Sequence, residues 1–217
     1  MNRYQLAIFD LDGTLLNTIG DLAVGCNHIL SGEGLPTHTY EQYCMMVGNG
    51  VKRLVERALP EECRTPEYIE EMRRRFVEFY YDHIDTHTTP YDGIAELLAE
   101  LQQRGVKLAV ASNKFQAGVV RLMERFFPEI HFEATLGGRP GIPAKPEPDI
   151  ANEIIRLVGV TPDSTLFIGD SGVDMLTAHA AGAVAVGCAW GFRSREELIE
   201  TKADHIIDHP SEILGLI

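Results

Sequence analysis

Short apolar runs that end in polar residues recur along the chain. The run Leu6–Phe9 comes first and is followed at once by Asp10. Runs of about four to eight apolar residues are typical of strands that are buried on both faces of a sheet. The sequence predicts further strands over residues 106–111, 132–136, 165–168 and 183–186.

Helical patterns separate these runs in the second half of the chain. Ile94, Leu97, Leu98 and Leu101 form one stripe at the spacing of a helix face. Further helices are predicted near residues 116–126, 148–158 and 172–181. Strands that alternate with helices indicate a parallel sheet with helices on both faces. We therefore predict an α/β fold with a doubly wound parallel sheet.

Residues 17–88 differ from the rest because they carry helical patterns without a strand. The clearest pattern is an apolar face formed by Ile69, Met72, Phe76, Phe79, Tyr80 and His83. Glycines and prolines divide the segment into several helices. The chain therefore predicts a core built from residues 1–16 and 89–217, with a small helical domain over residues 17–88 inserted at the edge of the sheet.

The segment Asp10-Leu11-Asp12-Gly13-Thr14 puts two carboxylates directly after the first predicted strand. Side chains two apart on a strand share a face, and Gly13 allows a sharp turn beyond it. Like charges this close repel unless a cation offsets them, and a hard divalent cation such as Mg²⁺ prefers carboxylate oxygens. A solvated turn is the alternative for this motif alone, since Asp and Gly are common in turns.

Further polar residues follow other predicted strands or lie between them. Ser112 follows one strand, and Asp170 and Asp174 follow another. Lys145 stands between them in a loop that contains glycine and proline. Because the carboxyl ends of parallel strands meet at one edge of the sheet, we expect these side chains to converge there with Asp10.

These positions, in this order, resemble the four motifs of the haloacid dehalogenase superfamily, and specifically of its Mg²⁺-dependent phosphatases. The first motif is similar to Asp10-Leu11-Asp12-Gly13-Thr14-Leu15, the second centres on Ser112, the third is Lys145, and the fourth carries Asp170 and Asp174. The resemblance spans essentially the whole chain. It implies a Rossmann-like core with an inserted helical cap domain over the active edge of the sheet.

The resemblance also implies a role for each residue. Asp10 is the nucleophile that becomes an aspartyl phosphate, and Asp12 is the acid and base that serves the leaving oxygen and then the attacking water. A halide leaving group needs no acid, so Asp12 favours a phosphatase over a dehalogenase. The remaining roles are phosphate binding by Ser112, Asn113, Lys145 and Thr14, and Mg²⁺ binding by Asp10, the backbone carbonyl of Asp12, and Asp170, with Asp174 orienting a metal-bound water or Lys145.

A glycine-rich loop in the helical segment is the candidate for substrate recognition. Gly48 and Gly50 flank Asn49 and expose backbone N–H groups at a helix start, and the cations Lys52 and Arg53 follow. A helix N-terminus with nearby bases suits a small anion such as a carboxylate. The loop resembles the corresponding segment of bacterial phosphoglycolate phosphatases, which implies 2-phosphoglycolate as the substrate. The alternative is a plain connection between two helices with solvated cations.

The charge balance narrows the choice of partner. The 217-residue chain has a formal net charge of -13, which argues against nucleic acid and anionic membrane surfaces because both attract basic proteins. We therefore expect a small phosphorylated metabolite bound at a local site, and a monomer or homodimer. The four cysteines without metal-binding spacing, the lack of a secretory signal and the lack of a long apolar stretch predict a cytoplasmic protein with reduced thiols.

Three alternatives to this function stay open. An inorganic pyrophosphatase, or a phosphatase of broad specificity for sugar phosphates and nucleotides, would share the core motifs. A phosphoaccepting regulatory module also places Asp, Ser or Thr and Lys around Mg²⁺, although such modules are far shorter and hold the acceptor on an internal strand. A sugar phosphomutase is disfavoured because Leu22 stands where those relatives carry a histidine.

Overall fold

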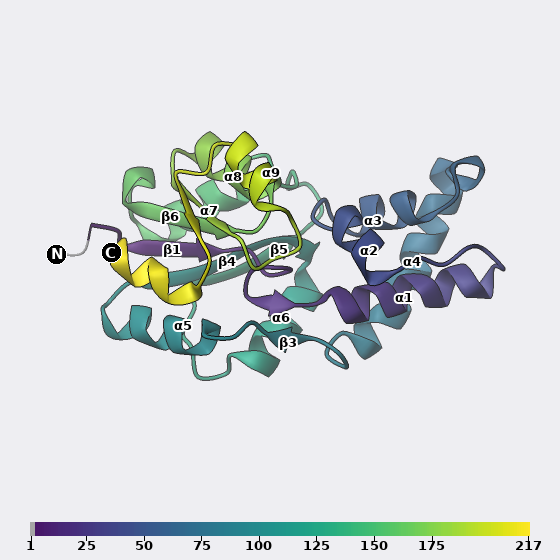
Figure 1. The fold of residues 1–217 in the computed structure, drawn as a ribbon, viewed down its shortest axis with the longest axis horizontal. Helices are drawn as coiled ribbons and strands as arrows, with labels where there is room; N and C mark the ends of the chain where they lie inside the picture. The colour runs from purple at the N-terminus through teal and green to yellow at the C-terminus, as the bar shows by residue number, and fades with distance from the viewer. Residues whose placement is uncertain (1–2) are drawn as a thin grey trace.

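A parallel sheet of six strands forms the centre of the larger lobe in the computed structural model, which describes residues 3–217 (Figure 1). The strands lie in the order β5-β4-β1-β6-β7-β8, and every neighbouring pair is parallel. Their bounds are β1 (Leu6–Phe9), β4 (Lys107–Phe115), β5 (Ala134–Gly138), β6 (Thr165–Gly169), β7 (Val184–Cys188) and β8 (His205–Ile207). The predicted α/β fold with a parallel sheet is confirmed.

Helices cover both faces of this sheet. Leu6 and Ile8 of β1 pack with α7 and α8, whereas Ala7 and Phe9 pack on the opposite face with α5 and α6. This alternation explains why β1 is apolar at every position, since both of its faces are buried. The helices of this lobe are α5 (Ile94–Gln103), α6 (Gln116–Phe126), α7 (Asp149–Val158), α8 (Gly172–Ala181) and α9 (Arg195–Glu200), with short 3₁₀ segments η2 (Pro162–Ser164) and η3 (Pro210–Gly215).

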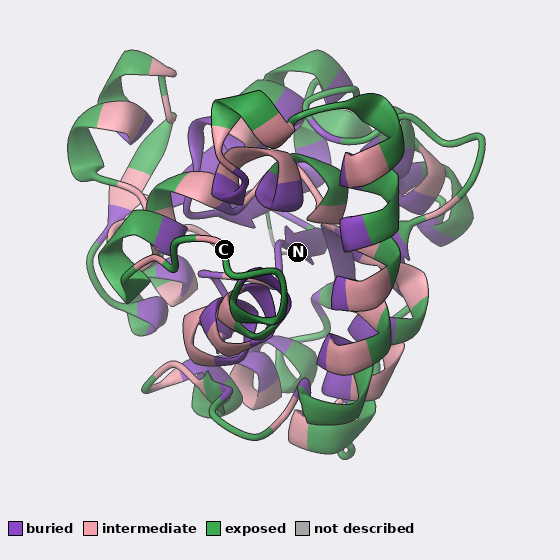
Figure 2. Ribbon diagram, turned by 90° about the vertical axis from the view of Figure 1, so that its right-hand side faces the viewer, coloured by how far each residue is buried: buried purple, intermediate pink, exposed green. Residues whose placement is uncertain are grey.

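The chain between β1 and α5 forms a second, helical lobe. Figure 1 shows its helices together at one end of the sheet, and Figure 2 shows that buried residues alternate with exposed ones along the helices. We call these helices the helical lobe; they are α1 (Ile19–Gly32), α2 (Tyr40–Met46), α3 (Val51–Ala58), the 3₁₀ segment η1 (Glu61–Cys63) and α4 (Pro66–His83).

The longest helix of this lobe, α4, illustrates how local sequence sets an element. Thr65 caps its N-terminus by accepting a hydrogen bond from the Tyr68 N–H, and Pro66 occupies the first turn, where no donor is lost. Its buried residues are Ile69, Met72, Phe76 and Tyr80. The apolar face is narrower than the sequence predicts, because Phe79 is half-buried and His83 is exposed.

A short antiparallel ribbon joins the two lobes. Strand β2 (Leu16–Asn17) pairs with β3 (Thr89–Pro90), so the chain leaves and re-enters the sheet lobe at one place. Beside the ribbon, the buried Asp21 carboxylate accepts hydrogen bonds from the backbone N–H groups of His87 and Thr88 and from the Thr88 hydroxyl. These donors offset the cost of burying a charge and fix the exit of the helical lobe.

Several boundaries differ from the predicted ones. Strand β4 continues through Ser112 to Phe115, and α9 and β8 have no counterpart in the sequence prediction. Strand β8 has only three residues at the edge of the sheet, with His205 exposed, so it lacks the apolar run that marked the other strands. Across residues 3–217, no helix has the length and apolarity needed to cross a membrane.

Candidate active site

Three buried carboxylates meet at the carboxyl edge of the sheet. Asp10 follows β1 directly and Asp170 follows β6 directly, and these strands are parallel neighbours, so both side chains emerge at the same edge. Asp174 comes from the first turn of α8. One carboxylate oxygen from each of these residues lies within 4.8 Å of the others. The structure therefore brings Asp10 of the first predicted motif together with both acids of the fourth, Asp170 and Asp174.

The turn after Asp10 depends on glycine. Gly13 has a φ of 89°, a conformation that residues with a Cβ rarely adopt. A Cβ at Gly13 would also collide with the Asp170 carboxylate. The sharp turn predicted at this glycine is confirmed, and it lets the chain pass close to the acidic cluster.

Burial of these acids makes their negative charge costly. Burial raises the pKa of Asp10 to about 7, with Lys145 opposing the rise and Asp174 adding to it. Burial and the nearby Asp174 likewise raise the pKa of Asp170 well above its usual range, although the Phe192 N–H donates to its Oδ2 at 2.7 Å. Three carboxylates against one lysine leave an excess of negative charge in a buried site.

This cluster fits a hard divalent cation. Asp10 Oδ1 is buried and accepts no aligned hydrogen bond from any of residues 3–217, even though Lys145 Nζ lies 2.8 Å away as an ion pair. Carboxylate oxygens that are close together and partly unsatisfied are ligands of the kind that Mg²⁺ prefers. The residues present are therefore suitable for the metal that the sequence predicts.

Lys145 forms ion pairs with two of the three acids in this cluster, Asp10 and Asp174. Its ammonium donates to Asp174 Oδ1 at 2.7 Å and to the Ala111 carbonyl at 2.9 Å, in addition to the ion pair with Asp10. Although burial alone would lower it, Asp10 and Asp174 raise the pKa of Lys145 above its ordinary value. The lysine is therefore a fixed positive charge that donates two hydrogen bonds and lies beside the Asp10 carboxylate as an ion pair.

Ser112, Thr14 and Asn113 surround this cluster. Ser112 is buried at the cavity wall and its hydroxyl accepts from the Lys114 N–H at 3.2 Å, while the Thr14 hydroxyl lies 3.4 Å from Asp170 Oδ1. The Asn113 amide binds only backbone groups: it accepts from the Lys145 N–H and donates to the carbonyls of Lys145 and Gly48. In this conformation Asn113 holds the lysine loop and the helical lobe in place.

Asp12 points away from the acidic cluster. Its carboxylate lies 2.9 and 3.2 Å from Lys114 Nζ and accepts a hydrogen bond of 2.7 Å from the Thr18 hydroxyl. The sequence prediction overlooked both Lys114 and Thr18. A signal for Lys114 was available, because it lies two residues after Ser112 and such residues share a strand face.

A cavity of about 30 Å³ lies between the two lobes beside these residues. The sheet lobe contributes the polar wall and the helical lobe contributes an apolar wall. Lys114 is the one basic side chain that lines it among residues 3–217. The lining residues are Asp10, Asp12, Leu22, Val47, Gly48, Gly50, Val51, Leu54, Ser112, Asn113 and Lys114.

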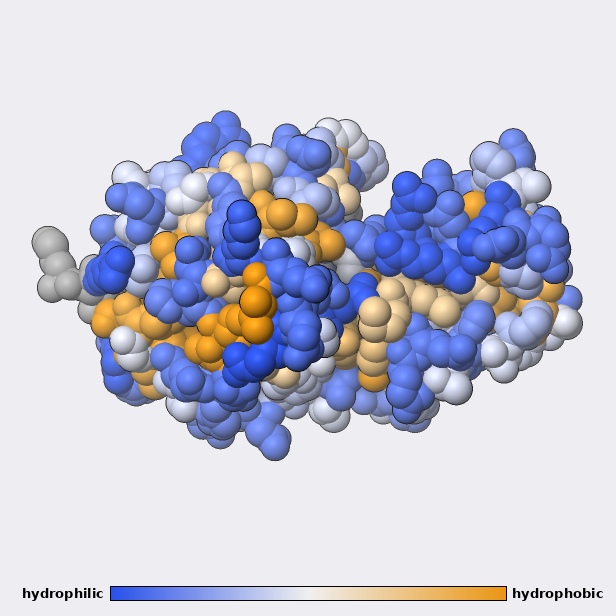
Figure 3. All heavy atoms as spheres, turned by 45° about the horizontal axis from the view of Figure 1, so that its top comes forward, coloured by the Kyte–Doolittle hydropathy of each residue, from blue (hydrophilic) through white to orange (hydrophobic). Residues whose placement is uncertain are grey.

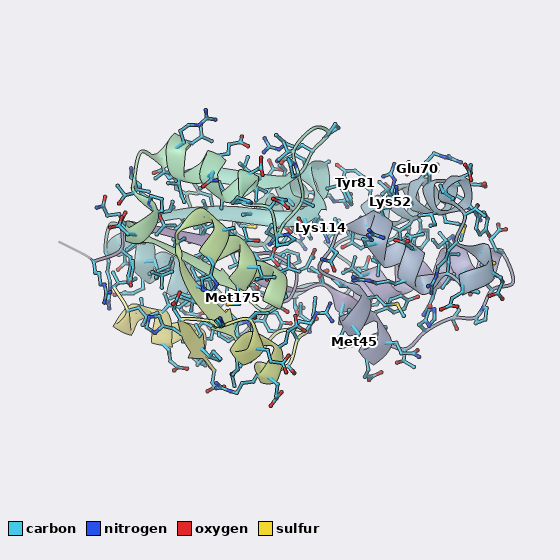
Figure 4. The ribbon with its side chains drawn as sticks, turned by 90° about the horizontal axis from the view of Figure 1, so that it is seen from above. Met45, Lys52, Glu70, Tyr81, Lys114 and Met175 are labelled. Atoms are coloured by element: carbon cyan, nitrogen blue, oxygen red, sulfur yellow. The ribbon has the colours of Figure 1, made fainter. Side chains whose placement is uncertain are left out.

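Only part of the predicted recognition loop reaches this cavity. Gly48 and Gly50 line it, whereas Asn49 and Arg53 line a separate open cleft of about 560 Å³ on the other side of the loop. Arg53 is 62% exposed and pairs with Glu56 of its own helix at 2.6 Å. Lys52 is exposed and lines neither space; it lies on the helical lobe, apart from Lys114 at the junction (Figure 4).

A third residue that the sequence prediction overlooked, Arg193, joins the lobes. It follows Phe192, and its guanidinium donates to the Val47 carbonyl at 2.8 Å. The next carbonyl of the same loop, that of Gly48, accepts from Asn113 at 2.9 Å. Two side chains from the sheet lobe therefore hold successive carbonyls of the helical lobe. Figure 3 shows a notch between the two lobes on the face that it draws.

Comparison with known proteins identifies the class to which this fold and site belong. Residues 7–188 match the family described as haloacid dehalogenase-like hydrolase. The chain belongs to this family.

The family contains relatives that match over nearly their whole length. A phosphoglycolate phosphatase from Pasteurella multocida strain Pm70 is 31% identical over 223 residues, which cover 100% of each chain. One from Pectobacterium atrosepticum is 33% identical, covering 96% of this chain and 90% of that protein. A solved structure described as a predicted phosphoglycolate phosphatase from Haemophilus somnus 129PT matches with a TM-score of 0.92 and 31% identity, covering 100% of this chain and 99% of that one. The predicted phosphatase of this family is thereby confirmed.

Proposed function

We propose that this chain is a Mg²⁺-dependent phosphomonoesterase that acts on a small phosphorylated metabolite, with 2-phosphoglycolate as the first candidate. The observation that carries the proposal is the buried Asp10 carboxylate. It lies between Lys145 and two further carboxylates, at the wall of a cavity that Asp12 and Ser112 also line. A nucleophile, a separate acid–base group and phosphate-binding donors are thus within one small site.

The reaction follows from these positions in two displacements. An oxygen of Asp10 forms a bond to phosphorus while the bond from phosphorus to the leaving oxygen breaks, and Asp12 gives its proton to that oxygen. Water then attacks phosphorus and loses a proton to Asp12, and the bond to Asp10 breaks to release phosphate. Ser112 and Lys145 bind the phosphoryl oxygens as charge spreads over them.

The metal would be held by Asp10, the backbone carbonyl of Asp12, and Asp170, with Asp174 beside them. When bound, Mg²⁺ supplies positive charge that offsets the repulsion between the Asp10 carboxylate and the phosphoryl group. The repulsion is strong here because the site is buried, and Lys145 already interacts with two acids.

We also propose that the helical lobe is a mobile cap, with residues 17–88 as the cap domain and residues 1–16 and 89–217 as the catalytic core. The ribbon of β2 and β3 lies at this division. A cavity of about 30 Å³ has room for one or two water molecules, and a phosphorylated metabolite needs more. Substrate entry therefore requires the cap to move away from the core.

The choice of 2-phosphoglycolate rests on the relatives and on the cavity. Relatives that match over nearly their whole length carry that activity in their names. The cavity is small and has a cation in its wall, which suits a short substrate with a second negative charge. Pyrophosphate is the second candidate, because its leaving phosphate would meet the same cation.

Phosphate release from a panel of substrates tests this proposal. We expect kcat/KM to be highest for 2-phosphoglycolate among that compound, pyrophosphate, sugar phosphates and nucleotides, with activity lost in EDTA and restored by Mg²⁺. Ca²⁺ is the matched metal control and should inhibit, because its larger and looser coordination shell favours a poor attack geometry. Full activity in EDTA contradicts the metal requirement, and a preference for pyrophosphate selects the second candidate.

A further inference from the structure

The site contains two buried lysines, and they are engaged to different extents. Lys145 directs its ammonium at three oxygens, those of Asp10, Asp174 and the Ala111 carbonyl. Lys114 has hydrogen bonds to the two oxygens of the Asp12 carboxylate and to no other group among residues 3–217. Because an ammonium has three N–H donors, Lys114 keeps one donor for a further acceptor.

The surroundings of Lys114 hold it in place at the cavity. Its side chain is 2% exposed, and its Nζ lies 4.8 Å from the centre of the Tyr80 ring, within the range of a cation–π contact. Burying an ammonium is costly unless it is paired, and here an aromatic ring and one carboxylate are its partners. Figure 4 shows Lys114 at the junction between the lobes.

The opposite wall supplies no competing charge. Across the cavity the helical lobe contributes the apolar side chains of Leu22, Val47, Val51 and Leu54 together with two glycines. Arg53 faces the separate open cleft. Among the lining residues of this cavity, the one basic side chain that a negative group on the substrate can meet is Lys114.

We propose that Lys114 recognises the negative charge on the leaving group of the substrate, and that it selects phosphoric monoesters of small α-hydroxy carboxylates. This inference rests on the proposed phosphatase function. Asp12 must contact the leaving oxygen to protonate it, and Lys114 Nζ lies 2.9 Å from Asp12. In an α-hydroxy carboxylate the carboxylate carbon is only one carbon beyond the leaving oxygen. The ammonium is therefore beside the position that this carboxylate takes.

The shape of the cavity limits the length of the leaving group. The side chains that the helical lobe contributes to the cavity are apolar, so none of them pairs with a charge placed further from the reacting phosphorus. An acid with its carboxylate one carbon more distant would move that charge away from the position beside Lys114. The position of one cation thus sets both the charge and the length of the preferred leaving group.

The test compares two substrates with the same carbon chain, 2-phosphoglycolate, which carries a carboxylate, and 2-hydroxyethyl phosphate, which carries a neutral hydroxyl in its place. We expect Lys114→Met to lower the ratio of their kcat/KM values by about 10- to 100-fold, mainly through KM, as expected for the loss of a charge-assisted hydrogen bond. Any effect on Asp12 is common to both substrates and cancels in the ratio, since the Thr18 hydroxyl still orients that carboxylate. Lys107→Met, at the opposite end of the same strand, is the matched control and should leave the ratio unchanged.

The possible outcomes distinguish a failure of the proposed role of Lys114 from a failure of the proposed phosphatase function. A wild-type preference for 2-phosphoglycolate that survives in Lys114→Met overturns the role of Lys114 and leaves the proposed function intact. A wild type that hydrolyses both compounds equally overturns the proposed substrate and this inference together. If Lys114→Met fails to fold by circular dichroism, Lys114→Gln gives the same comparison with a polar, uncharged side chain of similar length.

Discussion

Asp10 and Asp12 are separated by one residue, yet their carboxylates lie in different electrostatic surroundings. Asp10 is buried with two other acids and meets Lys145. Asp12 turns toward Lys114 and the Thr18 hydroxyl. Because burial raises the pKa of Asp10 to about 7, the nearby Lys145 and a bound cation are what would keep this carboxylate anionic for attack, while Asp12 gives and takes the proton.

Asp10→Asn tests the covalent step. We expect kcat to fall to less than about a hundredth of the wild-type value, because an amide is a poor nucleophile, while the fold is retained. Steady-state kinetics on freshly purified protein, with mass spectrometry to exclude deamidation, measures this. Retention of more than that fraction would mean that the reaction does not pass through Asp10.

The buried Tyr80 hydroxyl leads to a prediction about stability that does not depend on the catalytic mechanism. This hydroxyl has no hydrogen-bond partner among residues 3–217. Removing a buried, unsatisfied hydroxyl removes a desolvation cost, so Tyr80→Phe should raise the free energy of unfolding by about 1 kcal/mol and Tm by about 2–4 °C. Thermal unfolding followed by circular dichroism measures the change.

Tyr43 provides the matched control for this substitution. Its hydroxyl is also buried but donates to Asn27 Oδ1 at 2.7 Å. Tyr43→Phe should therefore lower the free energy of unfolding by about 1 kcal/mol, the opposite sign. Equal effects of the two substitutions would show that the Tyr80 hydroxyl has a partner after all.

Connections between elements, more than the elements themselves, hold the two lobes together. The loop after β7 provides Arg193, and the end of β4 provides Asn113. Their acceptors are successive carbonyls in the loop between α2 and α3. Both donors are on the sheet lobe and both acceptors are on the helical lobe, so the cap opening that we propose would have to break these hydrogen bonds.

Arg193→Ala should shift the cap toward open forms. We expect KM for the best substrate to rise about two- to tenfold, the range that corresponds to the loss of one hydrogen bond, and the radius of gyration without substrate to increase. Small-angle X-ray scattering and steady-state kinetics measure these effects. Arg195→Ala removes a nearby surface arginine that pairs with Asp208 and should change neither quantity. An unchanged radius of gyration in Arg193→Ala would show that this contact does not hold the cap.

The sequence predicts those parts of the whole molecule that depend on local pattern. Helices α6 and α8 begin and end at the predicted residues, because a continuous apolar stripe marks each of them. The convergence of Asp10 and Asp170 could be predicted from strand ends alone, whereas Lys145 lies in a loop and was assigned to the site by the family resemblance. Strand β8 could not, because an edge strand of three residues carries too short a pattern.

The site residues that the sequence failed to predict depend on the direction in which side chains point in the folded protein. Lys114 and Lys52 are both cations near glycine-rich or strand-end segments, but only Lys114 points into the cavity. Which of the two lysines points into the cavity depends on how β4 and α3 pack against each other across the lobes. A local sequence pattern does not predict that packing. Arg193 was overlooked for the same reason, since its acceptor lies 146 residues away in the chain.

The acidic cluster makes the stability of the whole molecule depend on pH and on metal together. Without metal, the folded pKa of Asp10 is raised to about 7 and that of Asp170 well above its usual range. In the unfolded chain both acids titrate near pH 4. Between these values the folded state binds more protons than the unfolded state, so these groups lower stability as pH rises from about 4 toward 7 and beyond.

Mg²⁺ should reverse this loss, because it binds the deprotonated carboxylates and only the folded protein holds them together. We expect saturating Mg²⁺ to raise Tm by about 5–10 °C at pH 8 and by clearly less at pH 5, where protons compete for the same oxygens. Groups elsewhere titrate alike with and without metal, so the difference between the two Tm curves isolates the cluster. Asp10→Asn removes one of the three acids and should flatten that difference. Differential scanning calorimetry measures the curves, and a Mg²⁺ effect that is equal at both pH values would contradict metal binding by these acids.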